Sequence, residues 1–246
     1  MREPDLDNAW NSIGRKSSAG SNRRAVLQWS STSFAIMKNI CAYLGILSLF
    51  GMTVLADEEG KNPIPTVTVA GPFDRGVWEL EGGAGEFGSF ATSTAKWETI
   101  NYQLEDLRVG WMYDSPRHAG WLRGNNEFLL EAFGGPVTKG PGSYLVGGSP
   151  LWRYNFVQPG ARLVPYIQLG MGALYNNIYR SREQSEIGQG FEFALQGGIG
   201  LKYLLNDRWA ISAEVAYRHI SNGGMTARNQ GLNSIGGLLL VSYIFH

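Results

Sequence analysis

The stretch FEFALQGGIGLKYLLNDRWAISAEVAYRHIS, residues 191–221, contains two alternating runs joined by a short polar turn, residues 205–208. The second run separates polar Ser212, Glu214 and Arg218 from apolar Trp209, Ile211, Ala213, Val215 and Tyr217. Alternation of this kind predicts β-strands, because successive side chains of a strand point to opposite faces. Since the polar face combines charges with glycines, we expect a narrow barrel whose apolar face points outward.

The same pattern recurs along much of the chain. Residues 191–203 oppose Glu192, Gln196 and Lys202 to Phe191, Phe193, Leu195, Ile199, Leu201 and Tyr203, and residues 163–171 alternate similarly. The chain contains 33 glycines, which disfavours long helices. We therefore expect eight strands near residues 76–90, 98–113, 121–133, 143–157, 162–175, 190–204, 208–221 and 232–245.

The predicted connections differ in length at the two ends of the strands. Residues 114–120, 158–161 and 205–208 read as short turns, whereas residues 176–189 and 222–231 read as long polar loops. Short turns on one side and long loops on the other are typical of outer-membrane barrels. The predicted fold class is therefore all-β, an eight-stranded antiparallel transmembrane β-barrel of outer-membrane type preceded by a signal peptide, and residues 76–246 form the barrel domain.

Two details of the barrel are also predicted. The apolar phase changes between Leu104 and Leu107, and this change predicts a β-bulge near Asp106. Four charged residues on the polar faces are expected to form a network inside the barrel: Glu192, Lys202, Glu214 and Arg218.

Composition excludes several classes of function. The 246 residues carry 21 basic and 21 acidic side chains, so there is no basic field for nucleic acid. A single cysteine rules out an internal disulfide and a multi-cysteine metal site, and with three histidines a structural zinc site is not expected. Apolar runs long enough for a membrane helix are confined to one N-terminal segment, which excludes a multi-helix membrane protein.

That N-terminal segment has the features of a secretory signal peptide. Residues 37–56 comprise a short basic start, an apolar core, and the small-residue cleavage site Val54-Leu55-Ala56. We interpret residues 1–36 as an over-extended reading frame or a long basic region, and residues 57–75 as a linker. An uncleaved anchor helix is the alternative for residues 37–56.

The chemistry of the chain concentrates in the stretch YRHISNGG, residues 217–224. His219 and Ser221 are two residues apart, so both point to the apolar, lipid-facing side of their strand. Histidine is a natural general base and serine a nucleophile, while Asn222 and the N–H groups of Gly223 and Gly224 are candidate oxyanion donors. The alternative is that His219 and Ser221 merely face lipid headgroups at the membrane interface.

Two motifs near the C-terminus carry a resemblance to a known family. His219-x-Ser221-Asn222 is followed by Asn229-x-Gly231-x-Asn233 and an aromatic-ended strand, a pattern that resembles the lipid A 3-O-deacylase (PagL) family. Looser similarities are Val164-Pro165-Tyr166 with Gly170-x-Gly172, and the segment Glu79-x-Glu81-Gly82-Gly83-Ala84-Gly85. The resemblance implies a bacterial outer-membrane barrel that hydrolyses the ester-linked acyl chain at the 3-position of lipid A.

The resemblance also implies roles for individual residues. His219 would be the base, Ser221 the nucleophile and Asn222 the oxyanion asparagine, and the family implies no cofactor or catalytic metal. Asn233 departs from the family, which has a carboxylate, usually Glu, at this position. By parity Asn233 shares the lipid face and can meet His219 across the hairpin. Its oxygen can accept a hydrogen bond from the imidazole but cannot stabilise the imidazolium by charge. Glu183 and Glu186 are loop carboxylates that offer a substitute, whereas Glu192 and Glu214 point inward by parity.

The implied partners are lipopolysaccharide and the membrane, with no nucleic acid, and homodimerisation is left open. With both termini periplasmic, strand 208–221 runs outward, so His219 and Ser221 lie in the leaflet that holds lipopolysaccharide. Two other classes of function compete with the esterase. One is a non-catalytic structural or adhesive outer-membrane barrel, and the other is a secreted soluble barrel that binds an apolar ligand inside.

Overall fold

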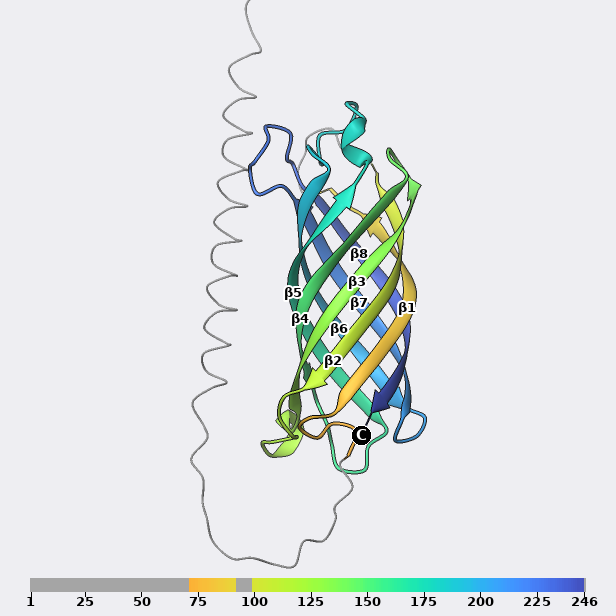
Figure 1. Ribbon diagram of the computed structural model, residues 1–246, viewed down its shortest axis with the longest axis vertical. Helices are drawn as coiled ribbons and strands as arrows, with labels where there is room; N and C mark the ends of the chain where they lie inside the picture. The colour runs from red at the N-terminus through yellow and green to blue at the C-terminus, as the bar shows by residue number, and fades with distance from the viewer. Residues whose placement is uncertain (1–70, 92–98, 246) are drawn as a thin grey trace, which may run out of the picture. The chain divides into compact units, whose positions relative to one another are not determined.

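The computed structural model describes residues 71–91 and 99–245, and within them the chain forms one closed antiparallel β-barrel (Figure 1). The predicted signal segment 37–56 and residues 1–36 lie outside the described residues, as does most of the linker. Each strand pairs with the next, and the first pairs with the last. The strands are β1 (Trp78–Ser89), β2 (Asn101–Met112), β3 (Asn125–Lys139), β4 (Tyr144–Asn155), β5 (Leu163–Asn176), β6 (Phe191–Leu204), β7 (Trp209–Ser221) and β8 (Leu232–Phe245).

The predicted eight-stranded fold is thus confirmed, although one strand and two connections differ from the prediction. β3 extends to Lys139, well beyond the expected end at residue 133, and Pro136 within it still pairs with Tyr144 of β4. The connection at residues 140–143 is consequently tight, and Gly140 and Gly142 adopt the positive φ angles that it requires. The connection expected as a short turn at residues 114–120 instead spans residues 113–124 and includes the 3₁₀ helix η1 (Gly120–Leu122).

The predicted bulge near Asp106 is wrong. β1 and β2 pair without interruption from Trp78–Trp111 to Phe87–Tyr102, and the register shift of β2 against β3 lies at Asn101 and Tyr102. The inward positions of β2 keep their parity throughout: Tyr102, Leu104, Asp106, Arg108, Gly110 and Met112 are all buried. The apolar positions change phase in the sequence because the inward side chains change from apolar, at Tyr102 and Leu104, to charged, at Asp106 and Arg108.

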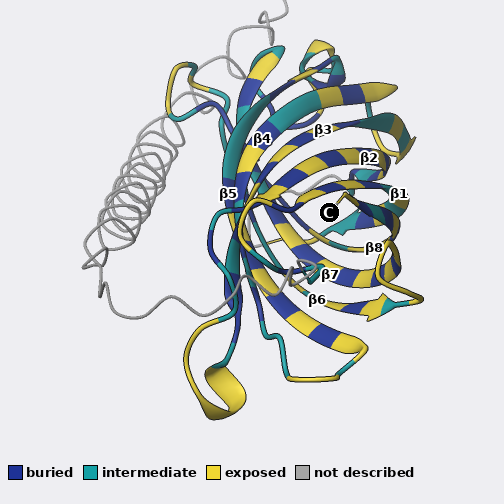
Figure 2. Cartoon of the chain, turned by 60° about the horizontal axis from the view of Figure 1, so that its bottom comes forward, coloured by how far each residue is buried: buried dark blue, intermediate teal, exposed yellow. Residues whose placement is uncertain are grey.

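The outer wall of the barrel is apolar. Exposed and buried residues alternate along the strands (Figure 2), and the exposed positions include Leu130 at 58%, Ile199 at 64% and Leu239 at 72%. Aromatic side chains cluster on neighbouring strands at the end where the chain terminates: Trp78, Trp111, Trp209, Tyr243 and Phe245. An apolar band with an aromatic girdle is the surface of a membrane-embedded barrel, and it disfavours the soluble-barrel alternative.

Among the described residues, the interior holds a network of charged side chains and two apolar clusters, and the smaller cluster comprises Phe73, Val77, Met112, Val164 and Ile244. Arg108 bridges Glu81, Asp106, Glu131 and Glu214, while Arg153 and Lys202 also contact Glu81. Lys202, Glu214 and Arg218 therefore join an interior network as predicted. Glu192 is buried but instead accepts hydrogen bonds from the loop amides of Gly188 and Gln189.

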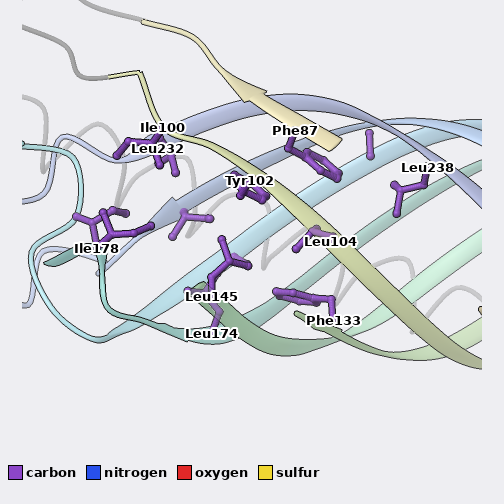
Figure 3. Packing of buried hydrophobic residues seen from close by; sticks show 14 of the residues in the cluster. Phe87, Ile100, Tyr102, Leu104, Phe133, Leu145, Leu174, Ile178, Leu232 and Leu238 are labelled. Atoms are coloured by element: carbon purple, nitrogen blue, oxygen red, sulfur yellow. The ribbon is translucent and has the colours of Figure 1, made fainter. Parts of the chain in front are cut away.

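The half of the interior toward the long loops is filled by apolar side chains, which the sequence analysis did not anticipate. Phe87, Tyr102, Leu104, Phe133, Leu145 and Leu174 belong to this cluster (Figure 3). Ile220 and Leu232, the inward neighbours of His219 and Asn233 in sequence, also belong to it. The cluster therefore packs against the inner side of the barrel wall that carries the candidate site.

Glu81 contacts three cations of the interior charged network, and its neutralisation should destabilise the barrel. Its carboxylate lies 3.0 Å from Arg108 and 2.8 Å from Arg153. Glu81→Gln removes the carboxylate that Arg108, Arg153 and Lys202 share within the buried network, so we expect the free energy of unfolding to fall by about 3 kcal/mol. Urea unfolding followed by gel mobility in detergent measures this change. Glu105→Gln, an exposed outward position on β2, is the control; equal effects would show that the network contributes nothing.

Candidate functional site

The β7–β8 hairpin brings two candidate residues together on the outer wall. His219 pairs with Asn233 across the two strands, and both occupy outward positions of the alternating pattern. His219 Nδ1 lies 2.8 Å from Asn233 Oδ1. The side chains therefore meet as their parity predicts, and Nδ1–H of the imidazole donates to the amide oxygen. This bond leaves Nε2 of His219 as the acceptor nitrogen.

Ser221 lies on the same face, two residues beyond His219. It is 5% exposed, and it pairs with Phe193 on β6, while His219 pairs with Leu195. Among the described residues, no hydrogen bond joins the Ser221 hydroxyl to His219. Two residues of a strand span about 6.5–7 Å, so rotation of the imidazole and hydroxyl toward one another is needed to form that bond.

Gly231 packs against the imidazole of His219. Its φ angle is +78°, and a Cβ atom at this position would lie 2.8 Å from Cε1 of His219. Its N–H donates to the carbonyl oxygen of Glu186 at 3.0 Å. A residue without a side chain is therefore required both by the backbone and by the imidazole that packs against it.

The loop after Ser221 is ordered by Asn222. This buried side chain accepts a hydrogen bond from Gly224 N–H at 2.9 Å and donates to Thr226 Oγ1 at 2.7 Å. The amide of Asn222 and the N–H of Gly224, both expected as oxyanion donors, are thus engaged within the loop. The backbone N–H of Asn222 donates to Asn229 Oδ1 at 2.9 Å, which holds the Asn229 side chain against the backbone of the residue that follows Ser221. Gly223 adopts a φ of 64° at the start of this turn.

A second loop, residues 177–190, packs against the first. The Arg228 guanidinium donates to the carbonyl oxygens of Tyr179 and Ser181, and Gln230 N–H donates to Ser185 O at 3.1 Å. A Cβ atom on Gly188 would lie 2.0 Å from Arg228 O, so this glycine permits the close approach. The two loops, including the 3₁₀ helix η2 (Ile178–Arg180), meet at the end of the barrel where β7 finishes (Figure 1).

The hydrogen bonds from the Arg228 guanidinium to the loop 177–190, here called the Arg228 clamp, hold the two loops together, and their removal should loosen both loops. Arg228→Met deletes charge-assisted hydrogen bonds to carbonyl oxygens, which lowers the free energy of local opening by about 2 kcal/mol. We expect cleavage of the loops by a protease to accelerate about 30-fold, as measured by the appearance of fragments on a gel. Arg182→Met, an exposed change in the loop 177–190 that Arg228 contacts, is the control. Similar cleavage of both variants would contradict the clamp.

The oxygen that lies 2.8 Å from His219 Nδ1 belongs to Asn233 and not to any of the four carboxylates considered in the sequence. Glu214 lies inside and binds Arg108, Glu192 binds loop amides, and Glu183 is exposed. Glu186 is buried, and its carboxylate accepts from Ser185 N–H at 2.8 Å. In the part of the chain that the structure describes, Asn233 is the partner of His219 Nδ1, and no group of His, Cys, Asp or Glu suited to a metal ion occurs.

Two residues near the site were missed by sequence reasoning. Tyr217 donates its hydroxyl hydrogen to Asn233 Oδ1 at 2.6 Å, and Asn229 holds the backbone of Asn222. Tyr217 could have been found from its spacing, since it precedes His219 by two residues and shares its face. Asn229 lies within the second quoted motif, but a loop residue has no parity that would place its side chain.

The fold and site define a bacterial outer-membrane barrel with a histidine, a serine and an asparagine on its outer wall. The chain belongs to the lipid A 3-O-deacylase (PagL) family, whose model matches residues 87–242. No helix among the described residues has the length and hydropathy needed to span a membrane.

Solved structures of small outer-membrane barrels are similar to the chain. The outer membrane enzyme PagL is 22% identical, with 68% of this chain and 97% of that chain covered and a TM-score of 0.45. OprG from Pseudomonas aeruginosa is 14% identical, with 70% and 97% covered and a TM-score of 0.44. Neisserial surface protein A is 14% identical, with 69% and 98% covered and a TM-score of 0.44. No curated protein sequence matches the chain significantly.

Proposed function

We propose that the protein is a serine esterase that removes the ester-linked 3-O-acyl chain of lipid A in the outer leaflet. The observation that carries this proposal is the 2.8 Å contact between His219 Nδ1 and Asn233 Oδ1 on the outer wall, two residues from Ser221. Membership of the PagL family supplies the substrate class. A base and a hydroxyl at outward positions of the barrel wall suit a substrate that enters laterally from the membrane.

In the proposed reaction, Nε2 of His219 takes the hydroxyl proton of Ser221 while Oγ forms a bond to the acyl carbonyl carbon. The tetrahedral intermediate then breaks its bond to the sugar oxygen, which receives the proton from His219. Water, deprotonated by the same imidazole, then adds to the acyl carbonyl carbon. The bond to Ser221 Oγ breaks, Oγ takes back the proton from His219, and the fatty acid is released. Asn233 accepts a hydrogen bond from Nδ1–H in both the neutral and the protonated ring, so Nε2 is the nitrogen that exchanges the proton.

The oxyanion that forms on the acyl carbonyl needs hydrogen-bond donors beside Ser221. Asn229 suits this role, because its Oδ1 is anchored on Asn222 N–H and its Nδ2 group donates to no other described residue. The N–H of Gly223 is the second candidate donor. Asn222 and Gly224 keep a role through the loop hydrogen bond that they form with each other.

The test is hydrolysis of lipopolysaccharide by the purified, folded barrel in detergent. We expect release of one 3-hydroxy fatty acid per lipid A, measured by mass spectrometry of the products. The alternative is a structural or adhesive barrel without turnover, which the asparagine at position 233 favours because it lacks the charge of the family's carboxylate. Intact lipid A after prolonged incubation would support that alternative.

A further inference from the structure

Asn233 Oδ1 receives two hydrogen bonds on the outer wall of the barrel. Tyr217 and His219 both point outward from β7, and Asn233 faces them from β8. The Tyr217 hydroxyl lies 2.6 Å from Oδ1 and the His219 Nδ1 lies 2.8 Å from the same atom. The Tyr217 ring is held in place by Phe90, with ring centroids 6.2 Å apart.

The length of the tyrosine contact indicates which end of the amide faces the histidine. A separation of 2.6 Å is ordinary for O–H···O but short for N–H···O. The oxygen of Asn233 therefore faces Tyr217, and the same oxygen reaches His219. Since a carboxylate has two acceptor oxygens, a Glu at this position would present an acceptor in either orientation, whereas an amide presents one acceptor and one donor.

The orientation of this amide decides the protonation of the imidazole. If Asn233 turned its NH₂ group toward His219, Nδ1 would become the acceptor and the proton of the neutral ring would move to Nε2. The proposed esterase needs Nε2 unprotonated to take the proton of Ser221. An asparagine at position 233 must therefore be held with its oxygen toward His219, whereas a carboxylate can accept from His219 in either orientation.

We propose that Tyr217 is a positioning residue that fixes the Asn233 amide and thereby the Nδ1–H tautomer of His219. The tyrosine does not touch the reacting atoms. It acts through Asn233, and it selects the amide orientation that presents the oxygen, rather than the NH₂ group, to His219. The consequence for rate rests on the proposed esterase function, whereas the consequence for the tautomer does not.

The first test is spectroscopic and independent of turnover. Nitrogen NMR of ¹⁵N-histidine-labelled barrel in detergent should show His219 protonated at Nδ1 in the unmodified protein. In Tyr217→Phe we expect a mixture of tautomers with a substantial Nε2–H fraction. Tyr203→Phe, an outward tyrosine on β6 with the same 41% exposure, is the control and should leave the His219 signal unchanged. An unchanged tautomer in Tyr217→Phe would overturn the proposal.

The second test is a double-mutant cycle on the rate of deacylation. Tyr217→Phe should lower kcat roughly tenfold, the effect expected for one hydrogen bond, with KM within about twofold because binding is untouched. In the Asn233→Glu background the same substitution should change kcat by less than about twofold. Equal losses in the two backgrounds would overturn the proposal. Absence of turnover in every variant would count against the esterase alone, since the NMR result stands by itself.

Discussion

Ser221→Ala is expected to abolish lipid A deacylation, with a loss in kcat of about 10³-fold or more. The substitution removes the proposed nucleophile and little else, because the hydroxyl forms no hydrogen bond with His219 in the structure and the residue is 5% exposed. Folding should be retained, since β7 keeps its pairing with β6 and β8. The measurement is the rate of fatty acid release from lipopolysaccharide by the purified barrel.

The matched control for this variant is Ser212→Ala. Ser212 lies on the same strand but faces the interior, and its hydroxyl has no hydrogen-bond partner among the described residues. We expect its activity to remain within about twofold of the unmodified protein. Full activity in Ser221→Ala would rule out Ser221 as the nucleophile. Equal losses of activity in both variants would indicate that the substitutions disturb the fold of the barrel.

The second large effect is a gain. Asn233→Glu should raise kcat by about 10²- to 10⁴-fold, because the loss of the corresponding charge in serine proteases costs about 10⁴-fold. A carboxylate beside Nδ1 stabilises the imidazolium that forms when Ser221 is deprotonated. The Tyr217 hydroxyl, now at 2.6 Å from Oδ1, would donate to the new carboxylate and help to solvate it. Single-turnover kinetics on lipopolysaccharide measures the change.

Two companion variants separate charge from geometry. Asn233→Asp has nearly the shape of the native side chain and should also raise the rate, if the acid reaches Nδ1 as the amide oxygen does. Asn233→Leu removes the acceptor and should lower the rate below that of the native protein. A fall in rate for both acidic variants would mean that the site is adapted to a neutral partner for His219.

The alternation of residue types predicted which side chains point outward from the barrel, because successive side chains of a strand always point to opposite faces. It placed His219, Ser221 and Asn233 outward, and the structure pairs His219 with Asn233 as that rule requires. It failed where the interior changes from charged to apolar. The buried Tyr102 and Leu104 looked like lipid-facing residues, and a bulge was inferred where none exists.

The loops were predictable only in part, because their side chains follow contacts between segments distant in sequence. Asn222 was assigned as an oxyanion donor from its motif, but its amide is engaged with Thr226 and Gly224. The Arg228 clamp depends on carbonyl oxygens more than 40 residues away, since its contact with Ser181 spans 47 positions. Spacing within one segment carries no signal for such a contact.

We propose that His219 and Ser221, at outward positions of β7, cleave an acyl ester of lipid A. The most direct measurement is the lipid A mass spectrum of cells that produce either the unmodified protein or Ser221→Ala at equal levels in the outer membrane. We expect lipid A lacking one 3-hydroxyacyl chain with the unmodified protein and complete lipid A with the variant. Identical spectra from the two strains, whether intact or shortened, would contradict the account.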